Sequence, residues 1–118
     1  GRSMTYAELT QVWERHWDFL EKSSYAAQAP IFIGEFGTCG TRKCVQDSTS
    51  GSQGLWFQFF MKYLTQHPEI GWSFWALNGT NTEGHDQPNY VLASDWKTPR
   101  NRLLIETLRD VEVAPPPV

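Results

Sequence analysis

The 118-residue chain predicts an α/β fold, because two strand-like apolar runs alternate with helical patterns along the sequence. The runs cover residues 30–36 and 70–77, and the helical pattern between them is long enough to connect parallel strands. Other helical patterns precede the first run and follow the second. Two strands alone leave both of them as edges, which does not make an independently stable sheet. We therefore expect the chain to form part of a larger structure.

The first helix is predicted from a capping box and from apolar spacing. In Thr5-Tyr6-Ala7-Glu8 the threonine hydroxyl and the glutamate side chain can satisfy amides at a helix start. The apolar residues recur at intervals of three and four and so form one buried face, made of Tyr6, Leu9, Val12, Trp13, Trp17 and Leu20. His16 lies beside this face, where we expect a structural role.

Two more helices are predicted on either side of the second strand. His67-Pro68 ends the first of them. Thr98 and Pro99 are expected to open the other, as N-cap and first helical residue. Polar segments 38–50 and 78–97 are expected to be loops. The buried faces of these helices are predicted to hold Leu55, Trp56, Phe59, Phe60, Tyr63 and Leu64, and then Leu103, Leu104, Ile105 and Leu108.

Composition excludes several classes of partner. A net charge of −3, spread along the chain, argues against a nucleic-acid surface. No run approaches the roughly 18 consecutive apolar residues of a membrane span, so no membrane contact is expected. Two cysteines, Cys39 and Cys44, are too few for a metal site, and no cofactor is expected. They are either free thiols or a local disulfide. We favour the disulfide because it would staple the loop after the first strand, as in an exported protein.

Glu35 is the most informative residue, because it places a lone carboxylate where an apolar strand ends. Burying an unpaired charge there would cost several kcal/mol. In parallel β-α units the active residues lie at the carboxyl ends of strands, and Trp75 occupies the matching end of the second strand. Glu35 could instead be a solvated loop residue, and Trp75 a core residue. Asn78 fits either a turn or a hydrogen bond to a ligand. The run Glu83-Gly84-His85-Asp86 has the spacing of no common metal site.

Two motifs together resemble a known family. Ile33-Gly34-Glu35-Phe36-Gly37, followed by Gly71-Trp72-Ser73-Phe74-Trp75-Ala76-Leu77-Asn78, is similar to the last two strands of glycoside hydrolase family five, especially its endo-β-1,4-glucanases (cellulases). Segments 12–20 and 92–98 resemble the sixth helix and the approach to the eighth. The resemblance implies that residues 1–112 are the C-terminal portion of a TIM (β/α)₈ barrel, from helix six to helix eight with strands seven and eight. Residues 113–118 are expected to be a proline-rich tail or the start of a linker.

The resemblance also implies an activity. Members of this family hydrolyse β-1,4-glycosidic bonds with retention, using a nucleophilic Glu on strand seven and an acid/base Glu on strand four. Carried over by position, Glu35 is the nucleophile, Trp75 is the sugar platform beside the cleaved bond, and Asn78 is a further candidate for substrate binding. The strand-four Glu has no counterpart here. The implied protein is a secreted, extracellular cellulase acting on β-1,4-glucan or cello-oligosaccharides. A complementary N-terminal barrel fragment, or an intertwined oligomer, would supply the acid/base Glu.

Two other functions fit the same motifs. A β-mannanase or xyloglucanase of the same family is one, because mannose and glucose differ mainly at groups that the missing half would contact. A noncatalytic carbohydrate-binding barrel fragment is the other. In all three cases strand alternation predicts which side chains face the barrel interior. The expected interior sets are Ile31, Ile33 and Glu35 on the first strand and Ser73, Trp75 and Leu77 on the second, with Trp72 and Phe74 facing the helices.

Overall fold

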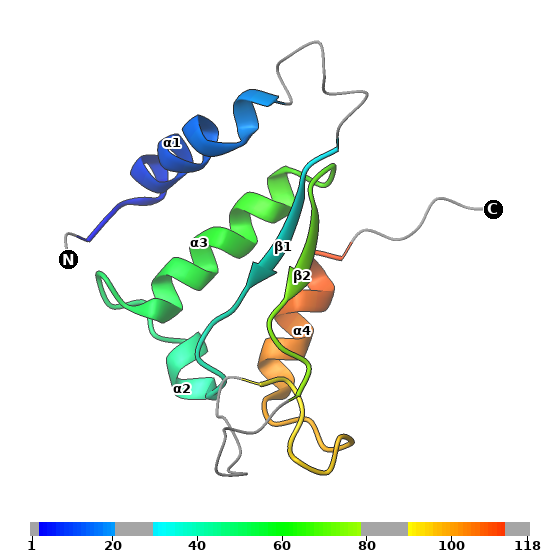
Figure 1. Ribbon diagram of the computed structural model, residues 1–118. Helices are drawn as coiled ribbons and strands as arrows, with labels where there is room; N and C mark the ends of the chain where they lie inside the picture. The colour runs from blue at the N-terminus through cyan, green and yellow to red at the C-terminus, as the bar shows by residue number, and fades with distance from the viewer. Residues whose placement is uncertain (1–2, 21–29, 79–89, 113–118) are drawn as a thin grey trace, which may run out of the picture.

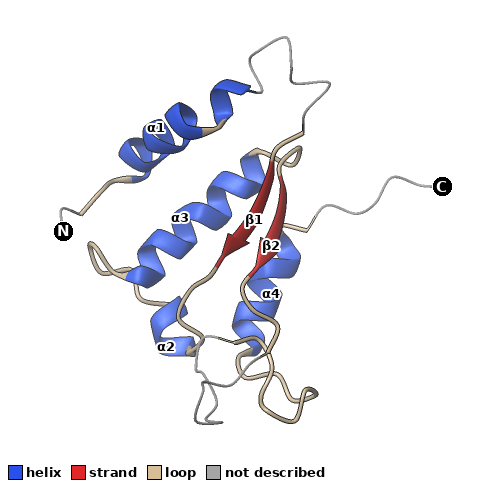
Figure 2. Ribbon diagram, viewed as in Figure 1, coloured by secondary structure: helices blue, strands red, loops and turns tan. Residues whose placement is uncertain are grey.

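The computed structural model describes residues 3–20, 30–78 and 90–112. Its centre is a sheet of two parallel strands, β1 (Phe32–Phe36) and β2 (Gly71–Phe74). The helices are α1 (Tyr6–His16), α2 (Arg42–Val45), α3 (Gln53–Gln66) and α4 (Arg102–Asp110), with a 3-10 turn at Asp18–Leu20. Figure 1 shows α3 and α4 beside the strands, with α1 on the outer side of α3. In the view of Figure 2, no helix or strand of the described ranges crosses in front of the sheet, so one face of it is open.

Aromatic rings from the sheet and α3 form the core. The Phe36 ring centroid lies 4.9 Å from that of Phe60 and 5.5 Å from that of Phe74, both in edge-to-face arrangements. Such pairs add about 0.5–1.5 kcal/mol each beyond the burial of apolar area. The most deeply buried side chains are Phe57, Tyr63, Leu64 and Leu104. The predicted face of α3 is confirmed in part: Phe60, Tyr63 and Leu64 are buried, and Trp56 and Phe59 pack on the margin of the core. Leu55 is not part of the core, and Phe57 and Met61, which the prediction left out, are buried.

The capping box of α1 forms as the sequence predicts. The Thr5 side chain accepts a hydrogen bond from the Glu8 amide at 3.3 Å, and the Thr5 amide donates to Glu8 Oε2 at 2.9 Å. Trp13 is the buried residue of this helix, and its ring packs on Phe60 and Tyr63 of α3. The helix ends at His16, before the last two residues of its predicted apolar face.

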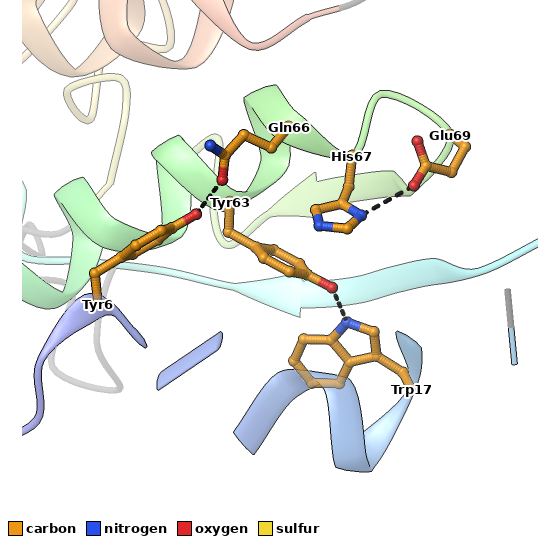
Figure 3. A network of polar contacts seen from close by, with 6 residues as sticks. All are labelled: Tyr6, Trp17, Tyr63, Gln66, His67 and Glu69. Carbon is orange, nitrogen blue, oxygen red and sulfur yellow. Dashed lines mark hydrogen bonds and ion pairs between the residues drawn. The ribbon is translucent and has the colours of Figure 1, made fainter. Parts of the chain in front are cut away.

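Polar contacts join α1 to the C-terminal half of α3 (Figure 3). Trp17 Nε1 donates to the Tyr63 hydroxyl at 2.9 Å, and the Tyr6 hydroxyl donates to Gln66 Oε1. Beyond them, His67 Nδ1 lies 3.0 Å from Glu69 Oε1, and the His67 ring packs against the Tyr63 ring. The Tyr63 side chain is buried, and a buried hydroxyl is costly unless it is hydrogen-bonded, so its bond with Trp17 helps to hold the end of α1 against α3.

The third predicted helix begins later than the sequence suggests. Thr98 and Pro99 do not open it; α4 starts at Arg102 with Asn101 as its N-cap, and the Asn101 side chain makes no capping hydrogen bond. The reason is local competition, because the Thr98 amide and hydroxyl both donate to the Asp95 carboxylate and hold a turn instead. Segment 38–50 also differs from the prediction, since it contains the short helix α2 after an N-cap at Thr41.

An extra residue in β1 changes which way its side chains face. Ile33 pairs with Trp72 and Phe36 with Phe74, so three steps along β1 match two along β2. Such a bulge reverses the alternation beyond it. Ile33 and Phe36 therefore both pack on the helical side, whereas Glu35 is exposed. The expectation that Ile31, Ile33 and Glu35 together face the barrel interior is wrong. Ile31 and Ile33 pack on the helical core, and the bulge turns only Glu35 away from them. The expectation for Trp72 and Phe74 is confirmed, because both pack against the core.

Candidate active site

Glu35 is the penultimate residue of β1, just past the extra residue. Its side chain is exposed, and it has no hydrogen-bond or ion-pair partner within residues 3–20, 30–78 and 90–112. An exposed carboxylate can reach a ligand without first breaking a contact in the protein. Donors that would fix its orientation, as a nucleophile needs, must come from a ligand or from polypeptide outside the described residues.

Trp75 lies directly after β2 and is joined to the residue next to Glu35. Its amide donates to the Phe36 carbonyl at 2.7 Å, and its peptide bond to Ala76 is cis. Its side chain is 56% exposed. Trp75 is thus not the core residue that the sequence left open as an alternative. The structure brings the two predicted site residues to the same end of the sheet.

Gly37 allows this close approach of the two strand ends. A Cβ at this position would lie 2.6 Å from the Trp75 carbonyl oxygen, a distance that real Cβ atoms do not adopt. Any other residue at position 37 would push the Trp75 backbone away. Gly34 is different, because a Cβ there would meet no atom within 4 Å. The glycine needed for the geometry of the site is therefore Gly37.

Large apolar side chains are exposed along β1 and after β2. Phe32 on β1 is 64% exposed, and Leu77, two residues after Trp75, is 58% exposed. Ser73, which alternates with Trp72 on β2, is exposed as well. Large exposed apolar surface often marks a site of interaction. This group of side chains, Phe32, Ser73, Trp75 and Leu77, is called the open face below.

Asn78 and the two cysteines shape the loops beyond the strands. The Asn78 side-chain amide donates to the Ala93 carbonyl, which ties the segment after β2 to residues 91–93. This contact gives Asn78 a structural role, and its contact with a sugar stays a prediction. Cys39 and Cys44 form a disulfide with a Cα–Cα distance of 6.0 Å. The bond connects the segment after Gly37 to α2, so it limits the motion of the loop next to the site.

A hairpin in segment 90–101 was missed by sequence reasoning, which treats residues 78–97 as one loop. Ala93 and Arg100 donate backbone hydrogen bonds to Thr98 and Val91 across it, at 2.8 and 3.0 Å. Its tip is closed by the Asp95 carboxylate, which accepts from the Lys97 and Thr98 amides at 2.9 and 2.8 Å. The Asp-x-x-Thr pattern of such a turn was visible in the sequence, where it competes with the Thr98-Pro99 helix signal.

The Asp95 turn gives a pH-dependent prediction. The hydrogen bond from the Thr98 side chain, followed by those from the Thr98 and Lys97 amides, holds the pKa of Asp95 below its ordinary value. The turn is therefore fully stabilised above the unfolded pKa of about 3.9 and loosens as pH falls through the lower folded value. Amide chemical shifts of Lys97 and Thr98 should follow this transition, and Asp95→Ala should produce the loosened shifts at neutral pH. Asp110→Asn is the control, and equal shift changes in both variants would contradict the prediction.

Other features of the described residues do not add to this site. Within them, no three His, Cys, Asp or Glu side chains are placed to hold a metal ion, and no helix is long and apolar enough to cross a membrane. Glu83, His85 and Asp86 lie outside the described residues, as does the predicted tail at 113–118. A cavity of about 150 Å³ is lined by residues of the N-terminal segment, α1 and α3, among them Met4, Leu9, Trp56 and Phe59, and so lies apart from Glu35.

Comparison of the chain with models of protein families, with curated proteins and with solved structures found no match. The barrel architecture and the glycoside hydrolase family therefore stay predictions from the sequence motifs. The geometry adds that an exposed carboxylate and an exposed indole lie at the matching ends of two parallel strands.

Proposed function

We propose that this chain supplies the nucleophile half of the active site of a retaining endo-β-1,4-glucanase. The observation that carries the proposal is the placement of Glu35, exposed at the carboxyl end of β1 and one residue from the carbonyl that binds the Trp75 amide. In parallel β-α folds this end of the sheet carries the reacting groups. A retaining glycosidase needs a nucleophilic carboxylate at the anomeric carbon, and an aromatic ring near it can stack on the sugar.

The reaction assigns a separate role to each group. The Glu35 carboxylate attacks the anomeric carbon while a second carboxyl group protonates the departing glycosidic oxygen. The glycosyl ester on Glu35 is then hydrolysed by water, from which the second group takes a proton. Two inversions at the anomeric carbon give net retention. The exposed Trp75 ring would stack against the apolar face of the glucose unit beside the cleaved bond.

The second carboxyl group is proposed to come from polypeptide outside these 118 residues, as an N-terminal barrel segment that completes the sheet. Both strands are edges of a two-stranded sheet, and the open face is largely apolar. Edge strands and exposed apolar surface both favour association with further strands. In the completed site the two carboxyl groups should lie about 5–5.5 Å apart, the separation of retaining enzymes.

The proposal is tested by combining the chain with the complementing N-terminal barrel polypeptide and following hydrolysis of carboxymethylcellulose. Proton NMR of the first products from cellohexaose should detect the β-anomer before mutarotation. Galactomannan and xyloglucan are run in parallel, because faster turnover of either would assign a related substrate. Glucan binding without turnover would favour the noncatalytic module. Products that appear first as the α-anomer would contradict the retaining mechanism.

A further inference from the structure

The hairpin at 90–101 is fastened to the strand end that carries Trp75. Val91 and Leu92 donate backbone hydrogen bonds to the carbonyls of Ala76 and Leu77, at 3.1 and 2.8 Å. Figure 1 shows this segment, drawn in gold to orange, beyond the ends to which both strands point. The hairpin therefore lies at the same end of the sheet as Glu35.

Trp96 is displayed at the tip of this hairpin. Its side chain is 63% exposed, and its backbone has a φ of 58°. Glycine or asparagine adopts this conformation most easily, whereas a bulky residue pays a conformational cost there. Because the indole is mostly exposed, little burial of its own offsets that cost. The stability of the described residues therefore does not explain why tryptophan occupies position 96.

The tip also keeps Trp96 in a defined position. Its amide donates to the Ala93 carbonyl at 3.0 Å, and the turn around it is closed by the Asp95 hydrogen bonds. A ring held on an ordered turn loses less conformational entropy on binding than a ring on a free loop. The Ala93 carbonyl also accepts a hydrogen bond from the Asn78 side chain. Trp96 follows Ala93 by three residues, so their Cα atoms lie at most about 10 Å apart.

We propose that Trp96 is a second sugar platform, which stacks on a glucose unit of the same β-1,4-glucan chain farther along than the unit on Trp75. The proposal rests on the function proposed above. A linear chain that leaves Trp75 along the strand ends passes the hairpin, because residues 91–92 are hydrogen-bonded to the residues directly after Trp75. Trp96 would then favour long chains over short ones. It would be a binding residue, distinct from the group that attacks the sugar.

Three variants of the assembled enzyme test this platform. Trp96→Gly removes the ring and accepts the positive φ, so the turn is kept. Trp96→Tyr keeps a ring that can stack. Phe19→Ala is the matched control, since Phe19 is 54% exposed in the 3-10 turn after α1, at the far end of the molecule from the hairpin in Figure 1.

The readout is KM for cellohexaose relative to KM for an aryl cellobioside. Trp96→Gly should raise this ratio by about three- to tenfold, as expected for the loss of one aromatic contact. Trp96→Tyr should recover most of the difference, and Phe19→Ala should leave the ratio unchanged.

An active enzyme whose KM ratio does not change in Trp96→Gly would overturn the platform and leave the proposed function intact. If no glucan is hydrolysed at all, the proposed function fails instead. In that case, migration in gels containing hydroxyethylcellulose tests whether Trp96 binds glucan. Wild type should be retarded more than Trp96→Gly, and equal mobility of the two would overturn the platform.

Discussion

Replacing Glu35 by Gln is expected to lower hydrolysis of β-1,4-glucan by the assembled enzyme at least about a thousandfold, a loss typical of removing a nucleophile. The amide is nearly isosteric with the carboxylate but does not attack the anomeric carbon. Binding should change little, because Glu35 is exposed and has no partner among the described residues whose contact would be lost. The measurements are kcat on carboxymethylcellulose and Kd for cellohexaose.

Two comparisons separate nucleophilic attack from a general effect of charge. Glu106→Gln removes the same charge from an exposed residue of α4 and should leave kcat unchanged. Glu35→Ala opens space in which azide can attack an activated aryl cellobioside from the side that the carboxylate occupied. The expected product is the α-glycosyl azide. Turnover of Glu35→Gln within tenfold of wild type, or a β-glycosyl azide from Glu35→Ala, would exclude the nucleophile role.

Gly54→Ala is expected to destabilise the fold by at least about 3 kcal/mol, at the upper end of what overpacking costs. A Cβ on Gly54 would lie 2.0 Å from the Cys44 carbonyl oxygen and 2.6 Å from that of Asp47. Both obstacles are backbone, and both are fixed. Cys44 is bonded to Cys39, and the Asp47 carbonyl accepts a hydrogen bond from the Ser52 side chain at 2.9 Å. Gly54 therefore allows α3 to start against the turn that follows α2.

Urea unfolding followed by tryptophan fluorescence measures this effect, with Gly34→Ala as the matched control. A Cβ at Gly34 meets no atom within 4 Å, so that variant should be neutral or more stable by up to about 1 kcal/mol. In an open helix position the same change would favour alanine by about 1 kcal/mol. A Gly54→Ala variant as stable as wild type would show that α2 and α3 can move apart at little cost.

Local signals in the sequence predicted the elements that depend on local contacts. The capping box at Thr5 formed because both of its hydrogen bonds join residues three apart. Helical periodicity found most of the buried face of α3 but missed Phe57 and Met61, because this helix is covered on more than one side. The start of α4 was wrong because Thr98 had two possible partners, and the Asp95 carboxylate competed better than the helix amides.

The candidate site was harder to predict, because it depends on pairing between strands. The positions of Glu35 and Trp75 at strand ends followed from the apolar runs, but the direction of Glu35 did not. That direction depends on an extra residue that becomes visible only when β1 is aligned with β2. The role of Gly37 depends likewise on the Trp75 carbonyl, which lies far away in the sequence. The position of the hairpin that carries Trp96 depends on hydrogen bonds between residues 91–92 and 76–77, which no local pattern indicates.

The bulge in β1 determines the face of the sheet from which the Glu35 side chain projects. Between the paired residues Ile33 and Phe36, two residues occupy a stretch where regular pairing allows one. Substitutions that keep this count leave the outward direction of position 35 unchanged. Regular pairing of all these residues would instead set Glu35 opposite Phe74 and turn its side chain toward the aromatic layer. Loss of Gly34 would remove the bulge but leave Glu35 as the single residue between Ile33 and Phe36, still directed outward.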